Sequence, residues 1–168
     1  MEKLLVVVDM QNDFVYGALG NISAQSIVRP LVQYISNFDG DVVYTQDTHQ
    51  ENYLETQEGR KLPVTHCVKD TNGWKLIDEL ENINFIKGFE KPTFGSLDLQ
   101  DFLKSSEYKE IHFVGVCTGI CVISNAVIAK ATLPEAKIVI HKGLCACVNN
   151  DTHDTALKAM ELLQMEVV

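Results

Sequence analysis

The chain has 168 residues, of which 46% are apolar and 22% are charged, and this size and composition are typical of one globular domain with a substantial core. Its net charge of −9 argues against nucleic acid and membrane as partners, because both favour a positively charged surface. No stretch is long and apolar enough for a membrane span, and the N-terminal segment lacks a signal-peptide cleavage region. We therefore expect a cytoplasmic protein with a single domain over residues 1–168.

Short apolar runs rich in β-branched residues recur along the chain. Four are well defined and two are weaker, and in chain order they cover residues 4–9, 41–47, 83–88 (weaker), 111–116, 137–143 and 165–168 (weaker). Most show little alternation with polar residues, which is typical of parallel strands that are covered on both faces of a sheet.

Segments with helical spacing lie between these runs, at residues 26–38, 97–106, 118–131 and 151–164. We expect Pro30 in the first turn of the first helix and Asp151 as the N-cap of the last. Residues 48–82 form one long irregular excursion, with a short helix predicted at 73–80. The alternation of strands and helices predicts an α/β fold, namely a three-layer, doubly wound sheet of six mainly parallel strands with helices on both faces.

Ionisable residues follow several of the predicted strands. Asp9 ends the first strand, and Asp47 ends the second, with His49 just after it. Cys117 and Cys121 follow a later strand. Because ligands of such sheets bind beyond the carboxyl ends of the strands, we expect these side chains to gather at one functional edge.

The five cysteines are an odd number for a disulfide framework, which a cytoplasmic protein would also disfavour. Cys145 and Cys147 are too close together for ordinary zinc-ligand spacing, and Cys117 and Cys121 have no matching second pair. We therefore interpret Cys67, Cys145 and Cys147 as structural.

Cys121 is a candidate nucleophile because it follows a strand at the start of a predicted helix. The N–H groups and partial positive charge of a helix N-terminus stabilise a thiolate and can hold an oxyanion. A small buried cysteine that packs the helix is the alternative. Asp9 could accept the thiol proton, or it could cap a turn. A nearby lysine, either Lys91 or Lys87, would lower the thiol pKa, although an exposed lysine is the ordinary case.

Asp47, His49 and His66 form a second candidate group. Carboxylate oxygen and imidazole nitrogen are suitable ligands for Zn, Mn or Fe. Histidines that only make structural hydrogen bonds are the alternative interpretation.

Five segments together resemble the isochorismatase-like cysteine hydrolases and, within them, the nicotinamidase-related amidases. The segments are LLVVVDMQNDF (Leu4 to Phe14), VVYTQDTH (Val42 to His49), LPVTHCVKDTNGW (Leu62 to Trp74), KPTFGSLDL (Lys91 to Leu99) and GVCTGICVISNA (Gly115 to Ala126). They occur in the family's order, and DMQNDF combined with the later G-x-x-T-x-x-C-V is specific.

The resemblance implies an Asp-Lys-Cys triad in which Asp9 accepts the proton, Lys91 is the lysine and Cys121 is the nucleophile. Some nicotinamidases use a Lys-Gly farther upstream, which keeps Lys87 open. The resemblance also implies a cis peptide bond before Cys117, and an oxyanion hole formed by the backbone N–H groups of Cys117 and Cys121.

The same resemblance implies a divalent metal held by Asp47, His49 and His66. This chain departs from the nicotinamidase pattern here, since Thr48 replaces the usual Trp and Tyr53 stands near the place of a further His.

Phe14, Phe94 and Ile120 are expected to line an apolar substrate pocket.

The function that these observations favour is a cysteine-dependent amidohydrolase that acts on a small carboxamide through a thioester. The resemblance implies a divalent metal (Zn, Mn or Fe), no organic cofactor and a homo-oligomer. Two alternatives stay open. One is isochorismatase-type vinyl-ether hydrolysis, which needs Asp9 more than a cysteine, and the other is a non-enzymatic thiol sensor or binding scaffold.

Overall fold

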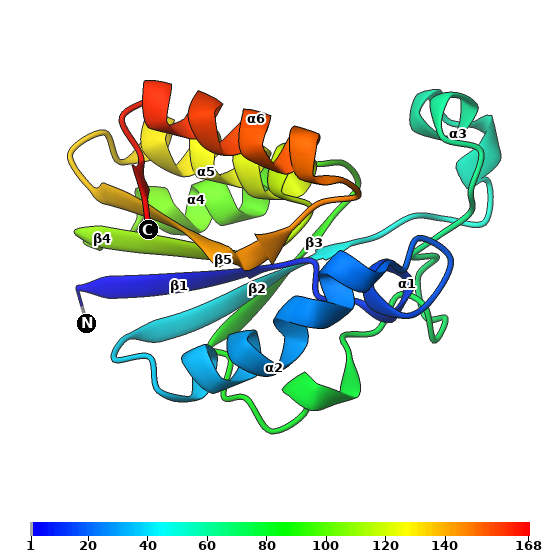
Figure 1. The fold of residues 1–168 in the computed structure, drawn as a ribbon, viewed down its shortest axis with the longest axis horizontal. Coiled ribbons are helices and arrows are strands. Elements are labelled where there is room, and N and C mark those ends of the chain that lie inside the picture. The colour runs from blue at the N-terminus through cyan, green and yellow to red at the C-terminus, as the bar shows by residue number, and fades with distance from the viewer. Residues whose placement is uncertain (1) are drawn as a thin grey trace.

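One sheet of six strands runs through the centre of the protein, whose structure is a computed structural model that describes residues 2–168 (Figure 1). The strands are β1 (Lys3–Val8), β2 (Asp41–Asp47), β3 (Lys87–Lys91), β4 (Glu110–Val116), β5 (Lys137–Ala146) and β6 (Glu166–Val167). Their spatial order is β3-β2-β1-β4-β5-β6, and every neighbouring pair is parallel. The predicted doubly wound sheet is therefore confirmed.

Helices cover both faces of this sheet. They are α1 (Asn12–Val15), α2 (Ile22–Ser36), α3 (Gln57–Lys61), α4 (Leu97–Lys104), α5 (Ile123–Thr132) and α6 (Asn150–Leu162). In Figure 1, α4, α5 and α6 lie on one face and α2 lies on the other, while α3 projects beyond the sheet. None of the helices in the part of the chain that the structure describes combines the length and hydropathy of a membrane span.

Two apolar cores flank the sheet because successive side chains of a strand point to opposite faces. Along β1, Leu4, Val6 and Val8 pack into the core beneath α4, α5 and α6, whereas Leu5 and Val7 pack into the core beneath α2. All five side chains are fully buried. This explains why the first strand is a continuous apolar run.

The prediction of a strand at 83–88 was wrong, because β3 begins only at Lys87 and runs to Lys91. Ile83 and Phe85 instead pack against the core beneath α2 without joining the sheet. β3 is an edge strand that alternates between exposed and buried residues, with Phe89 buried, so it is not an apolar run. With the observed strand bounds, Lys91 lies at the carboxyl end of β3 and pairs with Asp47 of β2.

Pro30 does not lie in the first turn of its helix, as predicted. α2 begins earlier because the Asn21 side chain caps it, accepting a hydrogen bond from the Ala24 N–H at 2.9 Å. Pro30 is consequently inside the helix, where it has no N–H to donate to the carbonyl of Ser26.

Two further predictions of helix boundaries were wrong. Asn149 caps α6 in place of Asp151, because its side chain accepts a hydrogen bond from the Thr152 N–H at 2.9 Å. The helix predicted at 73–80 is only a 3₁₀ turn over Asp78–Leu80. Conversely, α3 was not predicted, because five residues are too few to show apolar periodicity.

The strand order reverses direction at β1 and β4, which are neighbours in space although far apart in sequence. In doubly wound sheets, ligands bind outside the carboxyl ends of strands at such a switch point. Asp9 follows β1 here, and a π-helical turn over Thr118–Val122 follows β4. The topology thus brings the predicted functional residues to one edge.

Gly115 allows β4 to approach β1 at this switch point. Its φ of +115° is a conformation that L-residues rarely adopt, and a Cβ atom there would overlap the Val8 carbonyl oxygen. The pairing of β4 with β5 also shifts register between Phe113 and Gly115. The absence of a side chain at this position therefore sets how the end of β4 enters the site.

We expect Gly115→Ala to lower the free energy of unfolding by about 1–3 kcal/mol or more, because both its backbone conformation and the contact with Val8 become unfavourable. Gly143→Ala is the matched control, since a Cβ atom at Gly143 would meet no other atom within 4 Å. Urea unfolding of both variants checks this expectation, and equal free energies of unfolding would contradict it.

Candidate active site

Asp9, Lys91 and Cys121 meet at the carboxyl edge of the sheet. The Lys91 Nζ atom lies 2.6 Å from Asp9 Oδ2 and donates a hydrogen bond to Cys121 Sγ at 3.4 Å. All three residues are buried, with at most 5% of their surface exposed. These residues come from the ends of three different strands or their following turns, so only the folded sheet brings them together.

The Asp9 carboxylate is held in a fixed orientation. Its Oδ1 atom accepts a hydrogen bond from Thr45 Oγ1 at 2.6 Å, and its backbone N–H donates to the Thr45 carbonyl at 3.2 Å. Asp9 has a φ of 49°, in the left-handed region that non-glycine residues seldom occupy. Such strained conformations cluster at functional sites.

Lys91, and not Lys87, lies at this site. In addition to Asp9 and Cys121, its ammonium contacts Asp47 Oδ1 at 3.5 Å and the Thr93 carbonyl at 3.1 Å. Lys87 lies at the opposite end of β3, where its Nζ atom is above the Phe89 and Phe102 rings.

Cys121 lies in the π-helical turn Thr118–Val122, which precedes α5. The peptide bond between Val116 and Cys117 is cis. Asn125 supports the turn, because its Nδ2 atom donates to the Cys121 carbonyl at 2.8 Å and to the Phe94 carbonyl at 3.1 Å. This buried side chain therefore fixes the turn that holds Cys121 relative to the segment that follows Lys91.

The expectation of a lowered thiol pKa at Cys121 was wrong. Burial raises the pKa of this thiol well above its ordinary value, the Asp9 carboxylate adds to the rise, and the Lys91 ammonium opposes it. Burial also raises the pKa of Asp9, although Lys91 partly offsets that effect. Burial would lower the pKa of Lys91, but the negative charge of Asp9 raises it above its ordinary value. Desolvation and the Asp9 carboxylate thus outweigh the lowering effect of Lys91 on the pKa of Cys121.

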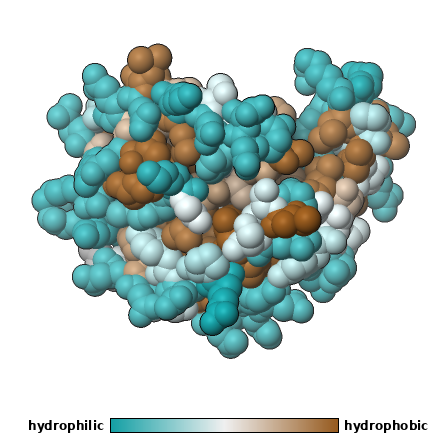
Figure 2. Space-filling view, viewed as in Figure 1, coloured by the Kyte–Doolittle hydropathy of each residue, from teal (hydrophilic) through white to brown (hydrophobic). Residues whose placement is uncertain are grey.

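A cavity of about 370 Å³ opens above Cys121. Its lining is mostly apolar, and it includes Phe14, Phe94 and Ile120, as expected, together with Cys117. The segment that carries α3 forms a lobe at one side of the molecule, and apolar surface lies between this lobe and the body (Figure 2). The lining residues that the sequence analysis did not single out are Leu19, Gly20, Asn21, Glu58, Leu62 and Val148.

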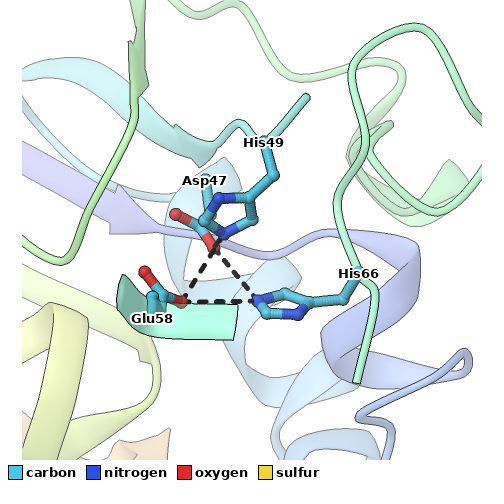
Figure 3. Close-up of side chains that lie close together, drawn as sticks. All are labelled: Asp47, His49, Glu58 and His66. Atoms are coloured by element: carbon cyan, nitrogen blue, oxygen red, sulfur yellow. Dashed lines mark hydrogen bonds and ion pairs between the residues drawn. The ribbon is translucent and has the colours of Figure 1, made fainter. Parts of the chain in front are cut away.

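Asp47, His49 and His66 lie together, and Glu58 from α3 joins them (Figure 3). Asp47, Glu58 and His66 line the cavity. One ligand atom from each of the four lies within 4.8 Å of the others. The Nε2 atoms of His49 and His66 lie 2.9 Å and 3.4 Å from Asp47 Oδ2. Glu58 Oε1 lies 3.6 Å from His49 Nε2 and 3.9 Å from His66 Nε2.

This donor set fits a divalent transition metal. Two imidazole nitrogens and two carboxylate oxygens, converging from buried or half-buried residues, are ligands that Zn, Mn and Fe accept. The His66 Nδ1 atom lies 2.7 Å from the Val64 carbonyl, which orients the ring so that Nε2 faces the cluster. Outer contacts of this kind are usual for metal-binding histidines.

Three residues of the site were missed by the sequence analysis. Glu58 was missed because it lies in the unpredicted helix α3. The buried Gln11 donates from Nε2 to the Asp47 and Trp74 carbonyls, both at 2.8 Å, and accepts from the Asp47 N–H at 2.7 Å. Asn125, which supports the turn that holds Cys121, is the third missed residue. Gln11 and Asn125 stand inside the segments that carry the resemblance, but only the fold reveals their partners.

Comparisons with known proteins point to one family. Residues 3–168 match the isochorismatase domain family. A protein of Bacillus subtilis described as an uncharacterised isochorismatase family protein, PncA, is 32% identical, over 94% of this chain and 93% of its own length. The nicotinamidase of Saccharomyces cerevisiae is 27% identical, over 76% of this chain and 81% of its own length.

Solved structures give the same result. The crystal structure of the pyrazinamidase of Pyrococcus horikoshii in complex with zinc has a TM-score of 0.85 at 25% identity, and the match covers 100% of this chain and 99% of that one. The nicotinamidase PncA from Bacillus subtilis has a TM-score of 0.81 at 27% identity, with the same coverage. Both the family match and the nearly full-length relatives lead to one assignment: the chain belongs to the isochorismatase family, and its named relatives include nicotinamidases and pyrazinamidases, which are hydrolases of amide C–N bonds.

Proposed function

We propose that this protein is a cysteine-dependent amidohydrolase that acts on a small carboxamide of the nicotinamide type. The observation that carries the proposal is the contact of one buried ammonium, Lys91 Nζ, with both Asp9 Oδ2 at 2.6 Å and Cys121 Sγ at 3.4 Å. This arrangement places a nucleophile, a proton acceptor and a fixed positive charge at the base of one cavity.

The raised pKa of the Cys121 thiol favours a neutral thiol beside the contact between Asp9 and the Lys91 ammonium. Asp9 takes the thiol proton as the sulfur attacks the carbonyl carbon. The raised pKa of the Asp9 carboxyl makes it a better proton acceptor than an ordinary aspartate. Lys91 stays protonated and stabilises the negative charge as it moves from the carboxylate to the sulfur.

The attack produces a tetrahedral oxyanion, for which we assign the backbone N–H groups of Cys117 and Cys121 as donors. Asp9 then delivers its proton to the amide nitrogen, the C–N bond breaks, and ammonia leaves a thioester on Cys121. A water molecule attacks the thioester with Asp9 as general base. The acid departs, and the thiol recovers its proton.

The substrate class follows from the cavity. A volume of about 370 Å³ with mostly apolar walls suits a small planar ring, and Phe14 and Phe94 offer aromatic faces to it. A divalent ion held by Asp47, His49, Glu58 and His66 would supply a Lewis-acidic position for a ring nitrogen or a water molecule at one end of that space.

The cavity is less suitable for a dianionic vinyl ether such as isochorismate. Among the described residues that line it there is no Lys or Arg, whereas Asp47 and Glu58 contribute carboxylates. A dianion would therefore meet two lining carboxylates with no Lys or Arg side chain of the lining to pair with it, which favours the neutral carboxamide.

We expect Cys121→Ser to lower kcat for nicotinamide hydrolysis by at least about 10³-fold, because the hydroxyl is a far weaker nucleophile in this site. Asp9→Asn should cause a loss of similar size, since the two residues act as a unit. Ammonia release from nicotinamide and pyrazinamide measures both effects, and circular dichroism checks folding. Full turnover in a folded Cys121→Ser variant would rule out the assignment of Cys121 as the nucleophile. A Cys121→Ser variant that still cleaved a vinyl ether would favour isochorismatase-type hydrolysis.

A matched pair of lysine variants tests the assignment of Lys91 over Lys87. Lys91→Met keeps a long side chain but leaves the buried Asp9 carboxylate without its partner, so activity should fall by at least about 10²-fold and stability by about 3–5 kcal/mol. Lys87→Met removes an exposed charge far from Cys121 and should change both quantities little. Steady-state kinetics and urea unfolding give the comparison, and the assignment fails if Lys87→Met is the inactive variant.

We expect the purified protein to contain about one equivalent of a divalent transition metal, and Glu58→Gln to weaken metal affinity at least about tenfold, because a neutral amide replaces a carboxylate ligand. Glu55→Gln, a change at the neighbouring 3₁₀ turn, is the control. Elemental analysis after dialysis against graded chelator measures retention independently of activity. Equal retention in the two variants would show that Glu58 does not bind the metal.

A further inference from the structure

Cys117 and Cys147 stand side by side at the ends of two neighbouring strands. The parallel register of β4 and β5 pairs Val116 with Ala146, so the next residue along each chain is a cysteine. Adjacent strands lie about 4.8 Å apart, and disulfides join residues whose Cα atoms are about 4.4–6.8 Å apart. Both thiols are free in the structure.

The two thiols lie close enough to influence each other's protonation. The Cys117 thiol is the main cause of the lowered pKa of Cys147, about 5. Cys147, together with burial, raises the pKa of Cys117. These shifts favour a thiolate at Cys147 beside a thiol at Cys117, which are the two forms that disulfide formation requires.

Further donors stabilise the Cys147 thiolate. Thr152 Oγ1 donates to its sulfur at 3.4 Å, and the backbone N–H groups of Gly119 and Val148 also donate to it. These groups belong to the turn after β4 and to the start of α6. Cys121 has no such set of donors and lies beside the Asp9 carboxylate, so the more reactive thiolate is next to the proposed nucleophile and not at it.

The cavity reaches the immediate surroundings of this pair. Cys117 and Val148, the residue after Cys147, both line it, and Val148 is 67% exposed, whereas Cys147 itself is buried. Hydroperoxides are small enough to enter a space of about 370 Å³.

We propose that Cys117 and Cys147 form a site of reversible oxidation by hydroperoxides, and that the resulting disulfide lowers the activity of the neighbouring hydrolase site. The first part concerns only the two thiols, whereas the loss of activity rests on the proposed function.

The Cys147 thiolate attacks one oxygen of the hydroperoxide, the O–O bond breaks, and after protonation the products are a sulfenic acid on Cys147 and an alcohol or water. The Cys117 sulfur then attacks the Cys147 sulfur and the S–O bond breaks. The hydroxyl leaves as water with the Cys117 proton. In total, two thiols lose two hydrogens and the hydroperoxide is reduced.

The disulfide would alter the site through the turn that holds the oxyanion. A disulfide brings two sulfur atoms to about 2.05 Å, well inside the distance of a hydrogen-bonded pair. The bond also ties the turn that carries Cys117 to the end of β5, and any accompanying shift of the Cys117 backbone moves its N–H, which is one of the two proposed oxyanion donors. Displacement of one such donor typically costs about 10²–10³-fold in rate.

The experiment treats the reduced protein with graded hydrogen peroxide, blocks the remaining thiols with an alkylating agent and digests it with trypsin. Cys117 and Cys121 fall in the peptide 110–130, and Cys145 and Cys147 fall in 143–158. We expect a cross-link between these two peptides that dithiothreitol removes. It should form in Cys145→Ser and in Cys121→Ser, and it should be absent in Cys147→Ser. A wild-type protein without this cross-link, or a cross-link that persists in Cys147→Ser, overturns the proposal.

Activity is measured on the same samples. We expect at least about a tenfold loss of nicotinamide hydrolysis as the cross-link forms, recovery with dithiothreitol, and a much smaller loss in Cys147→Ser than in the Cys145→Ser control. A complete cross-link with unchanged turnover overturns the regulatory part. A reduced protein that hydrolyses no amide contradicts the proposed function instead, and the cross-link still decides the oxidation site, so the two failures are distinguishable.

Discussion

The buried ammonium of Lys91 is the group on which the rest of the site depends. An uncompensated charge at this depth would cost several kcal/mol, and two carboxylates, Asp9 and Asp47, offset that cost. They stand at the carboxyl ends of β1 and β2, and Lys91 stands at the end of β3, so the parallel register of three strands places them together. The Lys91 ammonium gains both carboxylate partners only in the folded sheet. The geometry of the site therefore depends on the stability of the fold.

Asp47 connects the proposed triad to the metal cluster. Its Oδ1 atom faces the Lys91 ammonium at 3.5 Å, whereas its Oδ2 atom faces His49 and His66. Gln11 holds the backbone of Asp47 on both its N–H and its carbonyl. One carboxylate thus belongs to both groups, and a cation bound by Oδ2 would reduce the negative charge that Lys91 experiences. Binding of a cation at this cluster would therefore be coupled through the Asp47 carboxylate to the protonation of the proposed triad.

The parts of this site that could be predicted from the sequence are those with a local signal. Asp9 and Asp47 each end an apolar run, and that pattern correctly located the ends of β1 and β2. The edge strand β3 gave no such pattern, because only one of its sides pairs with the sheet and its residues alternate in burial. Glu58 could not be found, since its role depends on where a five-residue helix folds back over the cavity. A contact between segments that are far apart in the sequence produces no periodic pattern of apolar residues, so the sequence alone does not reveal it.

The cysteines show how burial can reverse an expectation that is based on position alone. A helix start beside a lysine indicated a thiolate at Cys121, yet desolvation and a carboxylate raise the pKa of that thiol. The neighbouring Cys147 was interpreted as structural, but its lowered pKa favours the thiolate. Oxidants attack the thiolate and not the thiol. The proposed oxidation would therefore begin at Cys147, which takes no part in the proposed hydrolysis, and Cys121, the proposed nucleophile, would be less exposed to it.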